Sequence, residues 1–326
     1  MKILLTGSEG FVGGYLRKEL EKTAHEIYCI DRVKVRRTNY FCFDLSNEIS
    51  NLTESFIDKD IEIVIHLAAA KGDYNLKYDD FYRDNVIASK NLISLIEALN
   101  IKSVVAYSTV SVYGHNNIIK SEEADLVPNN PYGETKLESE NLFINWYNLS
   151  SNKNKLTILR PSVIFGENNY ANMFNLLSQL NRKIPVSVGN GDYIKSMVAL
   201  ENIVHMTILC LSKLEGLQIY NCTDKPYPKL KEVIEDICEI KGFSRPKIII
   251  PKWFAYVLGL FFELISFLIR KDLGITRERI YKFTMPTDYR SEKIESIGYI
   301  QKYTIKDRIQ NMANWYLRIK KNNYEI

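Results

Sequence analysis

The sequence is poor in the features that define several classes of protein. Its five cysteines are scattered, odd in number and without a Cys-x-x-Cys pair, which argues against a disulfide framework and a zinc site. The formal net charge of +4 is small for 326 residues and does not indicate a nucleic-acid partner. Internal repeats and low-complexity tails are missing too. We therefore expect a globular protein with reduced thiols, no metal and no nucleic-acid partner.

Long apolar runs are also scarce. Residues 1–6 lead straight into a glycine loop without the apolar run of a signal peptide, so we expect a cytoplasmic location. The most apolar segment, residues 253–269, carries one charge (Glu263) and falls short of the roughly 20 residues of a spanning helix. We favour a buried or substrate-flanking helix. A peripheral membrane contact, or a lid over a lipid-linked sugar, is the less favoured alternative, and a spanning helix is the least favoured.

The sequence contains a glycine loop between a short apolar run and a helical pattern. A short apolar run over residues 2–5 ends at the loop of residues 6–14, and a helical pattern follows. Strand, glycine loop and helix in this order predict a dinucleotide site. The glycines would allow a tight turn, the approach of a pyrophosphate and close packing of the helix, whose free amides would meet the phosphates. The predicted pyrophosphate site consists of Gly7, Gly10, Phe11, Val12 and Gly13.

Two carboxylates follow the next apolar runs. Asp31 ends the run of residues 27–30, where it could accept both ribose hydroxyls of NAD and would repel the 2′-phosphate of NADP. Arg32 comes next and could hold that phosphate instead, so NADP stays an alternative to the favoured NAD. Asp44 and Leu45 end a third run and are expected at the adenine rim, although Asp44 could simply cap the following segment.

Further strands alternate with helical stretches. Residues 61–67 form a near-continuous apolar run, as in a strand buried on both faces, and Leu67, Ala68 and Ala69 would let a flat cofactor lie against the backbone. We interpret His66 as a packed strand-end residue rather than a catalyst. Alternating strands and helices predict an α/β fold, a Rossmann-type doubly wound parallel sheet with ligands at the carboxyl ends of its strands. We expect an NAD(P)-binding domain over residues 1–165. A smaller C-terminal α/β substrate-binding part should span 166–326, with some segments returning to the first domain.

Tyr132 and Lys136 lie four residues apart at the start of a helical stretch that runs to residue 149, so their head groups share one face. A free tyrosine has a pKa of about 10. A neighbouring lysine cation favours the tyrosinate and lowers that pKa, which makes the phenol usable for proton transfer. We expect this pair at the same sheet edge as the glycine loop.

Together these residues resemble the extended short-chain dehydrogenase/reductases, specifically the nucleotide-sugar epimerase/dehydratase family. The resemblance covers most of the chain and includes residues 6–13, 31, 44–45, 66–70, 108–114, 131–136, 159–161 and 165–166. It implies that Tyr132 is the catalytic acid/base, that Lys136 holds the nicotinamide ribose, and that Thr109 is the hydroxyl partner. Both Tyr132 and Lys136 would thus contact the cofactor. Asn85 resembles a supporting position in relatives, or is an ordinary polar residue of its helix.

Departures from the family pattern narrow the chemistry. Family dehydratases carry an Asp-Glu pair where this chain has Val110 and Ser111, and relatives that epimerise carbons beside the ketone place a cysteine at the Ser111 position. What remains is exchange of a hydride and a proton at one carbon. The resemblance implies substrate contacts from Ser111, from Asn172 at a helix start, from Lys195 where relatives usually have arginine, and from a second cation, Arg279 or Arg277.

The favoured function is an NAD-dependent UDP-hexose 4-epimerase, which oxidises C4 transiently and returns the hydride to the opposite face. An NAD(P)H-dependent 4-ketosugar reductase would use the same residues and is the alternative. A lipid- or sterol-type dehydrogenase and a non-catalytic NAD(P)-binding protein are less favoured. Helical stretches over residues 81–99 and 133–149 pair with their copies in relatives, so we expect a homodimer.

Overall fold

The computed structural model describes residues 1–70, 76–114, 119–149, 154–269 and 276–322. Its centre is a seven-stranded sheet in the order β10-β6-β5-β4-β1-β2-β3. All neighbouring strands are parallel, which confirms the Rossmann-type doubly wound sheet. The strands are β1 (Lys2–Thr6), β2 (Glu26–Asp31), β3 (Tyr40–Cys42), β4 (Ile63–His66), β5 (Ser103–Tyr107), β6 (Lys155–Pro161) and β10 (Leu217–Cys222).

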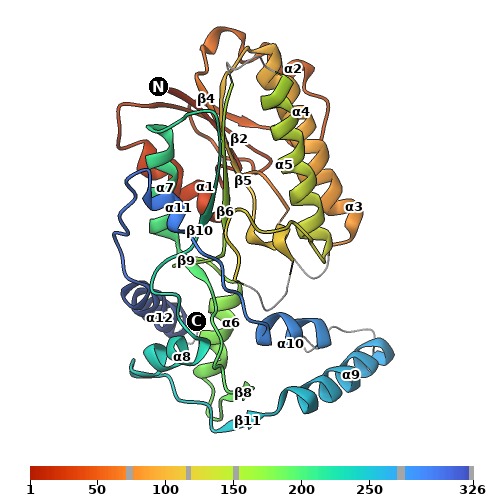
Figure 1. The fold of residues 1–326 in the computed structure, drawn as a ribbon, viewed down its shortest axis with the longest axis vertical. Coiled ribbons are helices and arrows are strands. Elements are labelled where there is room, and N and C mark those ends of the chain that lie inside the picture. Colours follow the sequence, from red (N-terminus) through yellow and green to blue (C-terminus); the bar gives the residue numbers. More distant parts are fainter. Residues whose placement is uncertain (71–75, 115–118, 150–153, 270–275, 323–326) are drawn as a thin grey trace.

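Helices cover both faces of this sheet (Figure 1). Ile3 and Leu5 of β1 belong to the apolar core under α1 (Phe11–Leu20) and α7 (Leu200–Leu211), where the short α11 (Glu292–Glu295) also packs. Leu4 points into the other core, under α2 (Ser50–Glu54), α4 (Ala88–Ala98) and α5 (Pro131–Leu149). Strand residues alternate between the faces, so a strand buried on both sides must be apolar throughout.

The helix predicted over residues 81–99 is built differently. It begins as α3 (Tyr78–Phe81), passes through a π-helical turn, η2 (Tyr82–Ile87), and continues as α4. Such π-turns are rare and are often found at functional sites. Short 3-10 turns occur at η1 (Ile57–Lys59) and at η3 (Val110–Tyr113), directly after β5.

The C-terminal half builds a smaller part below the sheet in Figure 1. Its core lies among α6 (Asn172–Leu180), α8 (Leu230–Cys238) and α12 (Ile305–Asn322). Two strand pairs complete it, β7 (Val163–Phe165) with β9 (Met197–Ala199) and β8 (Val186–Val188) with β11 (Ile248–Ile250). Helix α7 and strand β10 return to the large sheet from this half of the chain. The boundary at residue 165 stays a prediction.

Two helices, α9 (Lys252–Ile269) and α10 (Arg277–Thr284), project from the smaller part (Figure 1). The expectation that residues 253–269 are buried is wrong for one side of α9, where Trp253 is 70% exposed and Leu264 58%. The reason is that α10 packs on the opposite side of α9, where Gly259 faces Ile280 and Arg277. Within the described residues, no helix is both long and apolar enough to cross a membrane.

Candidate active site

The glycine loop joins β1 to α1 and packs closely against neighbouring backbone. Gly7 has a φ of +71°, and a Cβ on it would lie 2.6 Å from the Ala68 amide nitrogen. A Cβ on Gly13 would lie 2.0 Å from the Gly7 carbonyl oxygen. Gly10 caps α1 without a side-chain hydrogen bond, so the amides of Phe11 and Val12 in the first turn have no partner within the helix. This close-packed cradle fits the pyrophosphate of NAD.

The end of β2 carries the carboxylate predicted for the ribose. Asp31 Oδ2 accepts a hydrogen bond from the Glu9 amide at 2.9 Å, and its Oδ1 accepts from the Val33 amide at 3.1 Å. These bonds fix the carboxylate beside the glycine loop. Arg32 is 3.0 Å from Asp84 Oδ2, so its charge is already paired. Both observations favour NAD over NADP.

The two residues predicted for the adenine rim make contacts within the protein instead. Asp44 Oδ1 accepts hydrogen bonds from the amide and the hydroxyl of Ser46, which is the capping alternative. The Leu45 side chain is buried in the core between the sheet and α4. Its carbonyl oxygen accepts from Asn91 Nδ2 at 2.8 Å. The structure therefore does not bring the Leu45 side chain to the cofactor edge.

The loop after β4 links the glycine loop to the catalytic helix. The Ala68 amide, between Leu67 and Ala69, donates to Thr6 Oγ1 at 3.3 Å. His66 Nδ1 lies 2.8 Å from the same hydroxyl, and its Nε2 lies 3.3 Å from Ser89 Oγ. Burial lowers the pKa of His66 to about 3, so the ring is neutral and structural rather than catalytic.

Asn85 lies in the π-turn and makes a bridge. Its Oδ1 accepts from the Ala70 amide at 2.8 Å, and its Nδ2 donates to Thr135 Oγ1 at 3.0 Å. The side chain is buried, with 1% of its surface exposed. Asn85 therefore ties the loop after β4 to α5 next to Tyr132 and Lys136, and it acts as a positioning residue rather than an ordinary polar residue of its helix.

The three predicted catalytic residues meet at the carboxyl ends of β4 and β5. Tyr132 lies at the start of α5, half-buried beside Phe81, and the Thr109 side chain is near enough to affect its pKa. Thr109 directly follows β5 and donates to Ser111 Oγ at 3.2 Å. Lys136 Nζ donates to the Tyr107 carbonyl oxygen at 2.6 Å. Strands β1, β4 and β5 are neighbours in one parallel sheet, so this group shares an edge with Gly7.

The pKa values differ from the sequence-based expectation in one respect. Burial raises the pKa of Tyr132, although the nearby Thr109 side chain lowers it in part. The expected lowering by Lys136 does not prevail over burial, and the Lys136 ammonium donates to the Tyr107 carbonyl oxygen. Burial lowers the pKa of Lys136 itself to about 8, while the Glu140 carboxylate opposes that shift. The resting site thus pairs a protonated phenol with a lysine that is still charged at pH 7.

A buried polar network, which the sequence did not predict, lies beside the catalytic residues. Arg160 of β6 forms two hydrogen bonds with the Glu140 carboxylate of α5, at 3.0 and 2.7 Å. It also donates to the Tyr113 hydroxyl at 2.8 Å, which in turn donates to Asn221 Oδ1 of β10. Glu140 lies one turn after Lys136, so the network fixes the catalytic helix against the sheet. An arginine within the apolar strand of residues 155–161 was the available signal for it.

Ser108 is a second feature that the sequence did not identify as part of the site. Its hydroxyl is buried at the carboxyl end of β5, beside Thr109, and has no hydrogen-bond partner among the described residues. A buried hydroxyl without a partner next to a catalytic residue can be satisfied by a ligand. Ser108 is therefore a further candidate for contact with cofactor or substrate.

The predicted substrate residues come from both halves of the chain. Ser111 lies in η3, and Asn172 is the first residue of α6, as predicted. Lys195 Nζ donates to the Met285 carbonyl oxygen at 3.0 Å, and burial lowers its pKa to about 8. Arg277 of α10 pairs with Glu263 of α9 at 2.8 Å, so it is engaged away from Lys195. The Arg279 side chain lies outside the described part of the chain.

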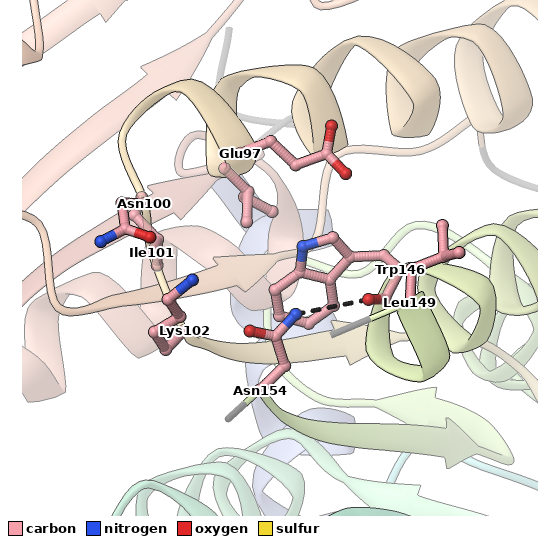
Figure 2. Close-up of a pocket in the computed structure, with 8 residues that line it drawn as sticks. Glu97, Asn100, Ile101, Lys102, Trp146, Leu149 and Asn154 are labelled. Carbon is pink, nitrogen blue, oxygen red and sulfur yellow. Dashed lines mark hydrogen bonds between the residues drawn. The ribbon is translucent and has the colours of Figure 1, made fainter. Parts of the chain in front are cut away.

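A shallow pocket elsewhere contributes nothing to this site. Figure 2 shows its lining, in which Asn154 Nδ2 donates to the Trp146 carbonyl oxygen at 3.3 Å. The pocket also includes Ile101 and Lys102, just before β5, and therefore lies at the amino ends of the strands. In parallel sheets ligands bind at the other edge.

Comparisons with known proteins agree with this geometry. Residues 3–223 match the model of the NAD dependent epimerase/dehydratase family. An N-acetyl-alpha-D-glucosaminyl-diphospho-ditrans,octacis-undecaprenol 4-epimerase of Escherichia coli O157:H7 is 27% identical over 98% of this chain and 97% of its own. A decarboxylating sterol-4-alpha-carboxylate 3-dehydrogenase of Mus musculus is 25% identical over 98% and 92%.

Among solved structures, the UDP-glucuronic acid 4-epimerase of Bacillus cereus in complex with NAD has the same fold. Its TM-score is 0.77 at 20% identity, over 98% of this chain and 99% of that one. This structure confirms the predicted fold, and the family match over residues 3–223 confirms the predicted NAD cofactor and enzymatic nature. The chain belongs to the NAD dependent epimerase/dehydratase family, whose members here are enzymes of the extended short-chain dehydrogenase/reductase type.

Proposed function

We propose that the protein is a 4-epimerase of a hexose whose C1 carries a diphosphate. The observation that carries this proposal is that Thr109, Tyr132 and the buried Lys136 come together at the sheet edge that holds the glycine loop. Val110 and Ser111 supply no carboxylate in η3, which speaks against elimination of water. The first of the relatives above is named as a 4-epimerase of a diphosphate-linked sugar, which supports the same reaction.

In this proposal each catalytic residue has its own role. When bound, NAD supplies the acceptor and later the donor of one hydride. The Tyr132 phenol must first lose its proton to solvent, and the resulting phenolate takes the proton of the C4 hydroxyl as C4 becomes a ketone. It returns that proton once the hydride is back on the other face. The Thr109 hydroxyl, close to the phenol, would help to orient it and the C4 hydroxyl. Lys136 contributes a positive charge that favours the phenolate, and its Nζ can reach the nicotinamide ribose in place of the Tyr107 carbonyl.

Two forms of the diphosphate substrate are open to test. UDP-hexose is the form favoured by the sequence. A polyprenyl diphosphate in place of UDP is the second candidate, supported by the substrate in the name of the E. coli relative and by the exposed apolar side of α9. Both forms present the same sugar and diphosphate to Tyr132 and Lys195. Lys195 offers a point charge rather than the bidentate fork of an arginine, so we expect a looser hold on the diphosphate.

The test is to incubate the NAD-loaded protein with UDP-hexoses and with polyprenyl-diphosphate-linked hexoses and to follow C4 by NMR. We expect inversion at C4 without net consumption of cofactor. Tyr132→Phe should slow it about 10²–10⁴-fold, the usual contribution of a general acid/base. Tyr147→Phe, at the other end of the same helix α5 and away from the candidate site, is the matched control. Stoichiometric oxidation of NADPH by a 4-keto sugar would instead identify the reductase.

A further inference from the structure

The exposed side of α9 forms a continuous apolar stripe. Its members recur at helical spacing, so they lie along one face, and each is between 42% and 70% exposed. We call these six residues the α9 stripe: Trp253, Phe254, Val257, Leu260, Phe261 and Leu264. Soluble proteins normally expose such side chains singly, and a contiguous set marks an interaction surface.

The other side of α9 is held against α10. Ala255 is buried, and a Cβ on Gly259 would lie 3.0 Å from Ile280 Cδ1 and 3.1 Å from the Arg277 amide nitrogen. Glu263 accepts hydrogen bonds from the amide and from Nε of Arg277, at 2.7 and 2.8 Å. These contacts fix which side of α9 faces outward. The stripe is thus presented on a hairpin that projects from the molecule (Figure 1).

The chain segments that lead up to the stripe are rich in cations. Strand β11 leads through Pro251 into α9 and pairs with β8, and it exposes Ile248 and Ile249. The segments that contain these two strands, residues 168–191 and 240–262, include no acidic residue. They carry six cations: Arg182, Lys183, Lys241, Arg245, Lys247 and Lys252. The whole chain has a formal charge of only +4, so these two segments carry a local excess of positive charge. The four acidic residues that border them are each paired with a cation: Glu167, Asp192, Glu239 and Glu263.

The stripe is also connected to the substrate side of the candidate active site. Lys252, the first residue of α9, donates to the Thr284 carbonyl oxygen at 3.1 Å. Lys195, the predicted diphosphate contact, donates to the next carbonyl oxygen, that of Met285, at 3.0 Å. Two adjacent peptide groups therefore join the base of the stripe to the residue expected to meet the diphosphate.

We propose that the α9 stripe, with Ile248 and Ile249 beside it, docks on an anionic lipid bilayer and so delivers a polyprenyl-diphosphate-linked sugar to Tyr132. Trp, Phe and Leu on one helix face with lysine and arginine around them are the composition of a helix that lies in the membrane interface. The diphosphate of such a substrate lies at the headgroup level, where Lys195 can meet it. The choice of substrate rests on the proposed 4-epimerase function, whereas the docking itself does not.

Sedimentation with vesicles tests the docking. Vesicles of phosphatidylethanolamine and phosphatidylglycerol should bind the NAD-loaded protein, more weakly at high salt, because screening weakens the attraction to anionic headgroups. Val257→Glu/Phe261→Glu should reduce binding at least about tenfold for each side chain withdrawn from the apolar layer. Ile57→Glu/Ile300→Glu replaces two exposed apolar residues elsewhere and should bind as the unmodified protein does. Leu260→Gln/Leu264→Gln provides a second pair on the stripe if the first unfolds.

Turnover separates the docking from the proposed function. The stripe variants should keep their rate on a water-soluble UDP-hexose within about twofold and lose at least about tenfold on a polyprenyl-linked sugar in vesicles. Vesicle binding without any C4 inversion would contradict the 4-epimerase function but support the docking. The docking is overturned if the unmodified protein fails to bind these vesicles. It is likewise overturned if lipid-free sedimentation shows a dimer that the stripe variants dissociate, because a second copy then covers the stripe.

Discussion

Replacing Arg160 by methionine should destabilise the protein through the carboxylate that it leaves behind. Arg160 and Glu140 side chains are each only 2% exposed, and the bidentate contact satisfies both. Removing one partner of a buried ion pair costs about 3–5 kcal/mol, because the other charge stays buried without compensation. Unfolding entropy of about 2.1 cal/mol/K per residue gives about 0.7 kcal/mol/K for 326 residues. The melting temperature should therefore fall by about 4–7 °C.

The double variant Arg160→Met/Glu140→Met makes this prediction sharper. Replacing both members of a buried pair by apolar side chains is often nearly neutral, so the double variant should melt above the single one. Differential scanning calorimetry at fixed pH and fixed NAD concentration measures both. The prediction is contradicted if the single variant Arg160→Met melts within about a degree of the unmodified protein. It is also contradicted if the double variant loses as much stability as Arg160→Met and Glu140→Met lose together, because the two residues would then not be coupled.

Three further predictions concern the cofactor site and the pH dependence of stability. A Gly13→Ala methyl group would lie 2.0 Å from the Gly7 carbonyl oxygen, so calorimetric titration should show NAD affinity reduced about tenfold or more; unchanged affinity would contradict the cradle. Asp31→Asn removes the charge that repels a 2′-phosphate and should narrow the NAD over NADP preference about tenfold, measured by the two dissociation constants. Burial raises the pKa of Asp224 from 3.8 to about 7, so the folded protein binds this proton more tightly than the unfolded chain. The resulting stability is fully present below pH 3.8 and is lost as the pH rises through about 7, a change of about 4 kcal/mol that Asp224→Asn should abolish in denaturant titrations across this range. An equally steep loss of stability in that variant would show that another group is responsible.

The parts of the fold that depend on local pattern could be predicted from the sequence. Apolar runs that end at Gly7, Asp31 and Ala68 identified three neighbouring strands, because buried parallel strands must be apolar on both faces. The spacing of Tyr132 and Lys136 placed both on one helix. These features need only a few consecutive residues to be recognised.

Features that depend on distant contacts could not be predicted in the same way. The π-turn around Asn85 is stabilised by Ala70 and Thr135, which are far from it in sequence. The raised pKa of Tyr132 reflects burial, which a count of neighbouring charges does not reveal. Apolar composition identified α9 as a helix but could not say that α10 covers only one side of it.

The fate of a deuterium placed on C4 of the sugar tests the central claim most directly. If Tyr132 moves only the hydroxyl proton while a hydride leaves C4 and returns to it, the label must stay on C4 of the inverted product. Mass spectrometry of the product formed in ordinary water should therefore show full retention. Loss of the deuterium to solvent would mean that C4 exchanges its hydrogen as a proton, and would contradict the role assigned to Tyr132, Thr109 and Lys136.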